Sequence, residues 1–143
     1  MEETWDGLPV AREQPFACCV VTWRVGLEGV REYLVLHRAH FGPEFAGDWA
    51  WTPPSGARQP GEEPPAAAAR ELREEIGLEL AFAEVTSPNP DIALYVAQAP
   101  VGAEVVLDAE HDSFRWLPLE EAAALCLPAT VAEGLRAAAL SLA

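Results

Sequence analysis

The first 40 residues contain two apolar runs separated by a short polar turn. Residues 16–23 and 32–38 are rich in Val, Leu, Cys and aromatic side chains, which predicts two buried strands. Gly26 and Gly29 lie between the runs, and glycine is common in tight turns. We therefore expect the two strands to form a hairpin.

The middle of the chain carries the pattern of an amphipathic helix. Pro64 and Pro65 are accepted in a first helical turn, where the backbone N–H groups have no partner within the helix. Residues 66–76 are almost all strong helix formers, and Gly77 is a typical C-terminal stop. The sequence therefore predicts a helix that ends at Ile76.

Shorter elements surround this helix. The pattern predicts strands over residues 50–52, 78–85, 92–97 and 113–117, a helix that begins at residues 118–122, and a last helix over 129–142. This order predicts an α/β protein in which a mixed β-sheet carries helices on both faces. We expect a single domain over residues 15–143, preceded by a polar, flexible segment over residues 1–14.

The charge balance narrows the classes of partner. All nine basic residues are Arg, against 23 Asp and Glu, so the net charge is −14. Such a field repels nucleic-acid polymers and anionic membranes. The absence of Lys also excludes a Walker-type phosphate loop. An anionic substrate would need added positive charge, for which a divalent metal ion is the main candidate.

Other compositional features point to an ordinary cytoplasmic protein. The longest apolar run is far too short to span a bilayer, and the acidic start at residues 1–6 does not resemble a secretory signal. The cysteines are Cys18, Cys19 and Cys126. Their odd number and the lack of a C-x-x-C pair predict buried thiols, with neither a disulfide framework nor a zinc site.

The predicted central helix has an acidic face. Glu71, Glu74 and Glu75 fall within an arc of about 100° on a helical wheel. Three carboxylates so close repel one another, and Mg²⁺ or Mn²⁺, which prefer oxygen ligands, would turn that repulsion into binding. A solvated acidic surface is the alternative reading of these three residues.

A longer spacing decides between the two readings. Gly56 is followed after five residues by Glu62, and after seven more by Arg70-Glu71-Leu72-x-Glu74-Glu75-x-Gly77-Leu78. This stretch resembles the Nudix box at every specified position. The resemblance implies the Nudix fold, an α/β/α sandwich with a catalytic loop–helix–loop, and hydrolysis of a diphosphate linkage in a nucleotide derivative.

The same resemblance implies roles for individual residues. Glu71, Glu74 and Glu75 would ligate Mg²⁺ or Mn²⁺, and one of them would act as the base for water. Glu62 would hydrogen-bond within the site or bind metal through water, and Arg70 would orient the carboxylates. A carbonyl at Gly56 would be a further metal ligand. No covalent nucleophile is required, since water attacks phosphorus.

Two flanking stretches resemble one branch of the family. Trp51-Thr52-Pro53-Pro54-Ser55-Gly56 and the segment from Glu110 to Leu117 are similar to motifs of asymmetric diadenosine tetraphosphate hydrolases. Related segments occur in nucleoside triphosphate and dihydroneopterin triphosphate pyrophosphatases. A dinucleoside polyphosphate is therefore the first substrate expected, and the two triphosphate classes are alternatives. A Nudix-fold binding module without catalysis is a third.

The resemblance places four more candidates, each with an alternative. Glu110 would be a late metal ligand or base, or a simple loop-end acid. His111 would touch phosphate or cap its loop, Phe114 would stack on a purine or pack in the core, and Arg38 would bind phosphate or lie on the surface. Three aromatic residues of the preceding loop are secondary candidates for base contact: Phe41, Phe45 and Trp49.

Two features depart from the branch. Ser55 stands where the polyphosphate hydrolases carry Lys, and the segment between residues 85 and 92 is short. We therefore expect phosphate binding to depend on metal and on Arg38 or Arg58. Many relatives form homodimers, so a second copy of the chain is a possible partner.

Overall fold

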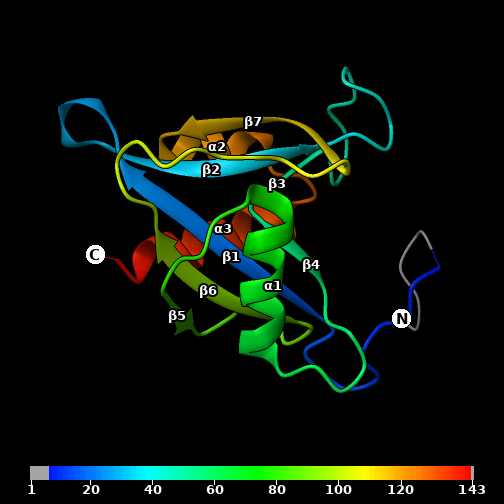
Figure 1. Ribbon diagram of the computed structural model, residues 1–143. Helices are drawn as coiled ribbons and strands as arrows, with labels where there is room; N and C mark the ends of the chain where they lie inside the picture. The colour runs from blue at the N-terminus through cyan, green and yellow to red at the C-terminus, as the bar shows by residue number, and fades with distance from the viewer. Residues whose placement is uncertain (1–6, 143) are drawn as a thin grey trace.

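A computed structural model describes residues 7–142, which fold around one central sheet (Figure 1). The strands are β1 (Ala17–Val25), β2 (Arg31–Arg38), β3 (Trp51–Thr52), β4 (Ser55–Ala57), β5 (Phe82–Val85), β6 (Ile92–Gln98) and β7 (His111–Leu117). The helices are α1 (Pro64–Ile76), α2 (Leu119–Leu125) and α3 (Ala129–Leu140), and a short 3₁₀ turn, η1 (Leu27–Gly29), joins β1 to β2.

The sheet is mixed, as the sequence predicts. β1 and β6 run parallel over seven residue pairs, whereas every other strand pair is antiparallel. The main path has the order β3-β2-β1-β6-β5, and β7 covers the other edge of β2. β1 and β2 form the expected hairpin.

Strands β1 and β2 pair only next to the turn that joins them, and they separate farther from it. This separation positions the site. β1 pairs with β2 only over residues 23–25, while its beginning pairs with β4. The far end of β2 pairs instead with β3. The chain from β3 to β4 therefore crosses from β2 to β1. Gly56 lies in β4, opposite Cys18 of β1.

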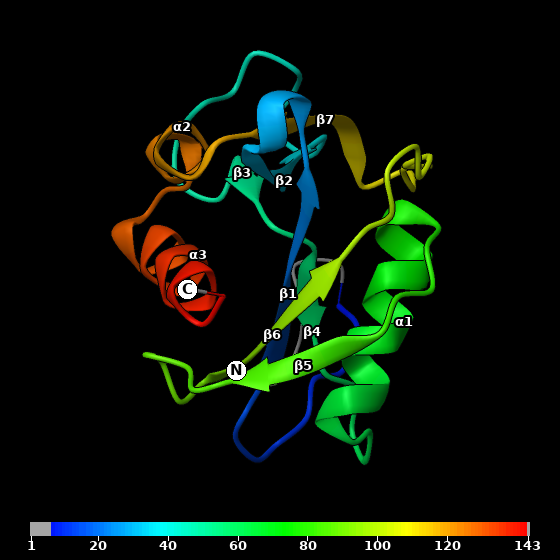
Figure 2. The same ribbon diagram turned by 90° about the vertical axis from the view of Figure 1, so that its left-hand side faces the viewer.

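Helices cover both faces of the sheet (Figure 2). On one face, α1 contributes Ala67, Ala68, Leu72 and Ile76 to a core shared with β1 and β2. On the other face, α2 and α3 pack against Val21, Val35 and Trp51. Alternate residues of the buried strands serve the two cores, which explains why these strands are apolar almost throughout.

Helix α1 begins and ends where its sequence predicts. Pro64 stands at the first helical position, and Gly77 adopts a left-handed conformation with φ of 71°. The Gly77 N–H donates to the Arg73 carbonyl, which satisfies one of the last carbonyls of the helix. A side chain at this φ would be strained, so glycine is the natural residue for this stop.

The largest differences from the expectation are one strand boundary and one additional strand. In addition, β7 begins two residues earlier than expected, at His111, and α3 ends two residues earlier, at Leu140. The strand expected from residue 78 begins only at Phe82, because Leu78 and Leu80 pack against the α1 core instead of joining the sheet. The three residues of β4 were not expected as a strand, since their pairing with β1 depends on the separation of the hairpin. Local composition carries no signal for either feature.

The beginning of the described chain is packed. Val10 and Ala11 are buried, and the Ala11 N–H donates to the Arg58 carbonyl at 2.8 Å. The expected flexibility of residues 1–14 is therefore not supported for this part, and residues 1–6 lie outside the described range. The segment is polar on average, and this average gave no indication that Val10 and Ala11 anchor it.

Two further expectations concern the membrane and the thiols. In residues 7–142 no helix has the length and apolar character that crossing a bilayer demands. Cys18, Cys19 and Cys126 are free thiols. Burial raises the pKa of Cys18 to about 11, so this thiol is protonated and inert at neutral pH.

Candidate active site

The acidic face of α1 divides into a buried pair and an exposed residue. Glu71 and Glu75 are 5% and 4% exposed, one turn apart on the side of the helix that faces β4. The backbone N–H of Ser55 donates to the Glu75 carboxylate at 3.0 Å. The Glu74 side chain is about half exposed. The sequence predicted one acidic arc, whereas the fold buries two of its three members.

Burial changes the titration of this pair. Loss of hydration raises the pKa of Glu75 well above its usual range, and the neighbouring Glu71 carboxylate raises it further. Burial likewise raises the pKa of Glu71. Two carboxylates in contact at a dry position cannot both stay ionised without a compensating cation. A bound cation would relieve this repulsion, as a proton does.

Arg70 connects the acidic residues of the box. Its guanidinium forms a bidentate pair with the Glu62 carboxylate, with N–O distances of 2.8 and 3.0 Å. It also donates to Glu71 at 3.0 Å, to Glu74 at 3.1 Å and to the Ala57 carbonyl at 3.0 Å. The hydrogen bonds from Arg70 to Glu62 lower the pKa of Glu62. Together, the contacts of Arg70 fix the loop before α1 against the helix.

Gly56 allows the loop to approach α1 closely. A Cβ atom at this position would collide with the Glu71 carboxylate, so no larger residue fits without displacing that side chain. The backbone of β4 therefore lies directly against the buried carboxylate pair. This contact brings the Gly56 backbone close to Glu71, one of the carboxylates expected to ligate metal.

The donor set fits a hard divalent cation, although the side chains are not yet arranged around one point. No three acidic, His or Cys side chains of residues 7–142 converge on a common metal position. In the structure, Glu71 and Glu74 both accept hydrogen bonds from the same Arg70 nitrogen, so these carboxylates surround the guanidinium. Glu74 is exposed and can rotate, so carboxylate oxygens from Glu71, Glu74 and Glu75 could gather around Mg²⁺.

Arg38 and Glu110 border the carboxylates from the sheet. Arg38 ends β2, and the Ala39 N–H beside it donates to the Glu110 carbonyl at 2.8 Å. Burial lowers the pKa of Arg38, and the charges of Glu75 and Glu110 oppose that shift. The structure thus brings the expected phosphate-binding Arg and the expected late metal ligand to the box, with Glu110 exposed.

The two other candidates on β7 behave differently from each other. His111 is buried, and its Nδ1 contacts the Asp108 carboxylate at 2.8 Å, which favours the loop-capping alternative. Phe114 lies opposite Leu36 of β2 on the face covered by α1. It is 39% exposed and belongs to neither core cluster of the described residues, which leaves its ring available for stacking.

The expected phosphate contact of Arg58 is not supported. Its side chain is 5% exposed and donates to the carbonyls of Pro15, Glu62 and Glu13 at 2.6–2.8 Å. A further contact joins it to the Glu13 carboxylate. Arg58 therefore anchors the start of the chain to the loop that carries Glu62. Its place between Gly56 and Glu62 suggested a site residue, and nothing in the sequence revealed its burial.

A second hydrogen-bond network, around His37, was not predicted from the sequence. His37 is 1% exposed, and its ring nitrogens contact the Asp112 carboxylate at 2.7 Å and the Phe45 carbonyl at 2.6 Å. Both partners are hydrogen-bond acceptors. This residue ties the loop before β3 to β7. A single His within an apolar strand gave no such signal.

Comparisons with known proteins identify the family of this chain. A family model of the NUDIX domain matches residues 17–138. The chain is 38% identical over 101 residues to the asymmetrical bis(5'-nucleosyl)-tetraphosphatase of Mus musculus, covering 59% of this chain and 69% of the relative. The structure resembles a binary complex of the C. elegans Ap4A hydrolase, with a TM-score of 0.70, 28% identity, and coverage of 88% and 97% of the two chains.

The chain therefore belongs to the Nudix family, with the α/β fold that its sequence predicts. It is a Nudix hydrolase acting on pyrophosphate bonds. Its fold is also similar to that of the E. coli dihydroneopterin triphosphate pyrophosphohydrolase, with a TM-score of 0.62, 21% identity, and coverage of 88% and 95%.

Proposed function

We propose that this chain hydrolyses dinucleoside polyphosphates in a reaction that depends on Mg²⁺ or Mn²⁺. The observation that carries the proposal is the buried Glu71–Glu75 pair, held beside Gly56 and connected to Glu62 through Arg70. The similarity to asymmetrical tetraphosphatases supports the choice of substrate. An asymmetrical cleavage of a four-phosphate chain would yield a nucleoside triphosphate and a nucleoside monophosphate.

The residues of the box would have two roles, metal binding and positioning of the carboxylates. Glu71, Glu74 and Glu75 would hold the metal, with Glu110 as a further ligand at the rim. Bound metal would neutralise phosphate oxygens and lower the pKa of a coordinated water molecule. Glu62 and Arg70 would keep the carboxylates in place, because their bidentate pair fixes the loop to the helix.

The sheet side of the site would bind the rest of the substrate. Arg38 would contact a phosphate, since its guanidinium is half-buried and lies beside Glu75 and Glu110, the carboxylates that would hold the metal. The exposed ring of Phe114 would stack on a base. His111 and Arg58, which the structure engages elsewhere, would take no direct part in binding.

A triphosphate is the second candidate substrate. Ser55 occupies the position at which the polyphosphate hydrolases carry Lys, and its backbone N–H is used by Glu75. A shorter phosphate chain would need fewer cationic contacts. Hydrolysis of a nucleoside triphosphate or dihydroneopterin triphosphate would then release pyrophosphate.

A substrate panel separates these functions. Wild-type protein in Mg²⁺ and in Mn²⁺ would be supplied with diadenosine tetraphosphate, nucleoside triphosphates and dihydroneopterin triphosphate, with nucleotide products and pyrophosphate measured. The proposal predicts the highest kcat/KM for the dinucleotide and no turnover in EDTA. Pyrophosphate release from triphosphates without cleavage of the dinucleotide would refute it in favour of the second candidate.

A further inference from the structure

Three aromatic residues lie in the loop between β2 and β3, and the structure separates their roles. Phe45 is partly buried against the α2–α3 core, and its carbonyl is bound by His37. The Phe41 ring is exposed but stacks within the loop, with ring centroids 4.5 Å from His40 and 4.7 Å from Phe45. These contacts direct the Phe41 and Phe45 rings toward other parts of the loop and the core, and not toward the carboxylates of α1.

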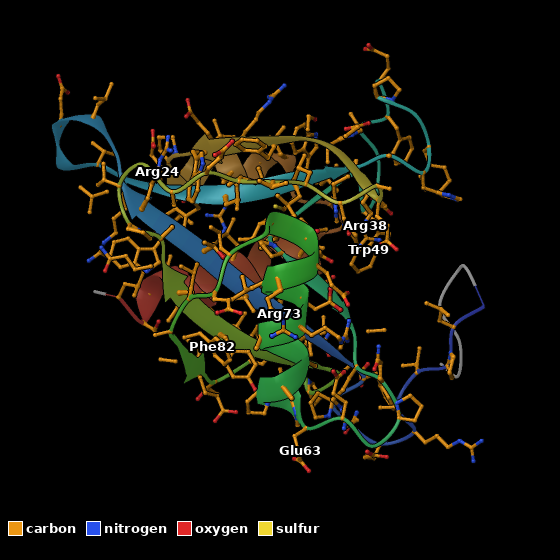
Figure 3. The ribbon with its side chains drawn as sticks, in the orientation of Figure 1. Arg24, Arg38, Trp49, Glu63, Arg73 and Phe82 are labelled. Atoms are coloured by element: carbon orange, nitrogen blue, oxygen red, sulfur yellow. The ribbon has the colours of Figure 1, made fainter. Side chains whose placement is uncertain are left out.

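Trp49 lies at the opposite end of this loop, next to Arg38 (Figure 3). The Arg38 guanidinium carbon is 5.9 Å from the centroid of its ring. Arg38 in turn interacts with the charges of Glu75 and Glu110. The indole is 44% exposed and is part of neither core cluster of the described residues. An open aromatic surface therefore adjoins the cation that faces the carboxylates.

The backbone holds Trp49 in this position against its own preference. Its φ is 68°, in the left-handed region that bulky residues rarely adopt. The Trp49 N–H donates to the Leu127 carbonyl at 2.6 Å, and the next N–H, of Ala50, donates to Gly47 at 3.1 Å. The Ala50 carbonyl accepts from the Arg38 N–H at 2.9 Å. These bonds fix the tryptophan to the end of β2.

Packing alone does not explain why an exposed tryptophan occupies a position with a left-handed backbone. A residue chosen for this backbone would be glycine or asparagine, which adopt positive φ at lower cost. A residue chosen for the surface would not be a half-exposed tryptophan, because large exposed aromatic side chains are typical of binding sites. Trp49 carries both costs, and its ring lies beside the Arg38 guanidinium.

We propose that Trp49 is a base-stacking residue: its indole contacts the nucleobase of the nucleotide whose phosphate is bound by Arg38. The inference rests on the proposed function, because it takes a nucleotide as the ligand of the α1 site. It adds a specificity-determining residue that no box motif includes. Stacking on an aromatic face tolerates different bases, so Trp49 selects for the presence of a base more than for its identity.

The test measures how much the base contributes to binding. Two non-hydrolysable ligands, α,β-methylene-ADP and methylenediphosphonate, share the diphosphate group and differ in the nucleoside. Their affinities in Mg²⁺ would be measured by calorimetry for wild type, Trp49→Gly and Trp49→Asn. Both replacements suit a positive φ, so we expect them to fold, with thermal melting as the check.

The expected result is a loss confined to the nucleotide. Trp49→Gly and Trp49→Asn weaken α,β-methylene-ADP binding by about tenfold and leave methylenediphosphonate binding unchanged. Trp49→Phe retains most of the affinity, and Phe41→Ala, the exposed aromatic control in the same loop, has no effect. Unchanged nucleotide affinity in the Trp49 variants, or an equal loss for both ligands, would overturn the inference.

The two proposals fail in different ways. If wild type binds α,β-methylene-ADP no more tightly than methylenediphosphonate, the role of Trp49 is refuted whatever the enzyme cleaves. If base-dependent binding is present and depends on Trp49, but diadenosine tetraphosphate is not cleaved, the proposed substrate is wrong and the stacking role stands.

Discussion

At the scale of single residues, the site is defined by the contrast between Glu74 and its neighbours. Glu71 and Glu75 are buried, and Glu74 is exposed and bound to Arg70. The buried pair has an electrostatic cost in the folded protein that a proton or a cation relieves. Function and stability are therefore coupled at these carboxylates, and the two can be measured separately.

Replacement of Glu75 by Gln tests the catalytic side of this coupling. The amide keeps the size of the side chain and removes a charged metal ligand. We expect kcat to fall by about 10³-fold or more, with an unchanged circular dichroism spectrum. Glu79→Gln, an exposed acid just beyond the helix, is the matched control and should retain activity. Wild-type turnover by Glu75→Gln in Mg²⁺ would refute the role of Glu75.

The same variant tests the cost of burial in metal-free protein. The folded state raises the pKa of Glu75 above its ordinary value of 4.5, so it favours the protonated form. The destabilisation is absent below that ordinary value and grows as pH rises through the raised pKa. In EDTA, Glu75→Gln should therefore match wild type near pH 4 and exceed it at neutral pH.

Urea denaturation across this pH range measures the difference in unfolding free energy. Each unit by which the Glu75 pKa is raised corresponds to about 1.4 kcal/mol of stabilisation in the variant at high pH. A difference that stays constant from pH 4 to pH 8 would show that Glu75 does not titrate abnormally in the fold.

At the scale of elements, the loop between β4 and α1 is held by two arginines with separate roles. Arg70 binds the side chain of Glu62, whereas Arg58 binds the Glu62 carbonyl and the segment at residues 13–15. The start of the chain is thereby connected to the loop that carries Glu62. This arrangement predicts that Arg58 contributes to stability and makes no contact with phosphate.

Arg58→Met should be destabilising. The change leaves the carbonyls of Pro15, Glu62 and Glu13 without their donor, at about 1–3 kcal/mol for each buried group that water does not reach. We expect a loss of about 2–4 kcal/mol in urea denaturation. Arg12→Met, at an exposed arginine nearby, should stay within about 0.5 kcal/mol of wild type. Full stability with weakened phosphate binding would instead restore the substrate-binding role of Arg58.

Local elements were predictable where their residues determine them. Pro64 and Gly77 define both ends of α1, and the apolar residues of β1 and β2 predicted a buried hairpin. Features that depend on distant contacts were not predictable. β4 requires the separation of β1 from β2, and the burial of Arg58 requires carbonyls of residues 13 and 15. The strain at Trp49 likewise depends on Leu127, far along the chain.

At the scale of the whole molecule, the net charge of −14 is in part a property of the site. Glu62, Glu71, Glu74 and Glu75 all lie in the box, and Glu110 borders it. Without metal this field would repel a polyphosphate, so the proposed function requires cation binding before or together with substrate binding. The prediction that an acidic chain needs a metal to bind an anionic substrate thus rests on specific carboxylates.

Mn²⁺ binding measured by electron paramagnetic resonance tests this account most directly. Free Mn²⁺ gives a strong signal that is lost on binding, so titrations of wild type, Glu75→Gln and the Glu79→Gln control yield affinities without any assumption about substrate. We predict specific binding by wild type and Glu79→Gln, and at least about tenfold weaker binding by Glu75→Gln. Equal Mn²⁺ affinity in all three proteins would contradict the assignment of the buried Glu71–Glu75 pair as the metal site.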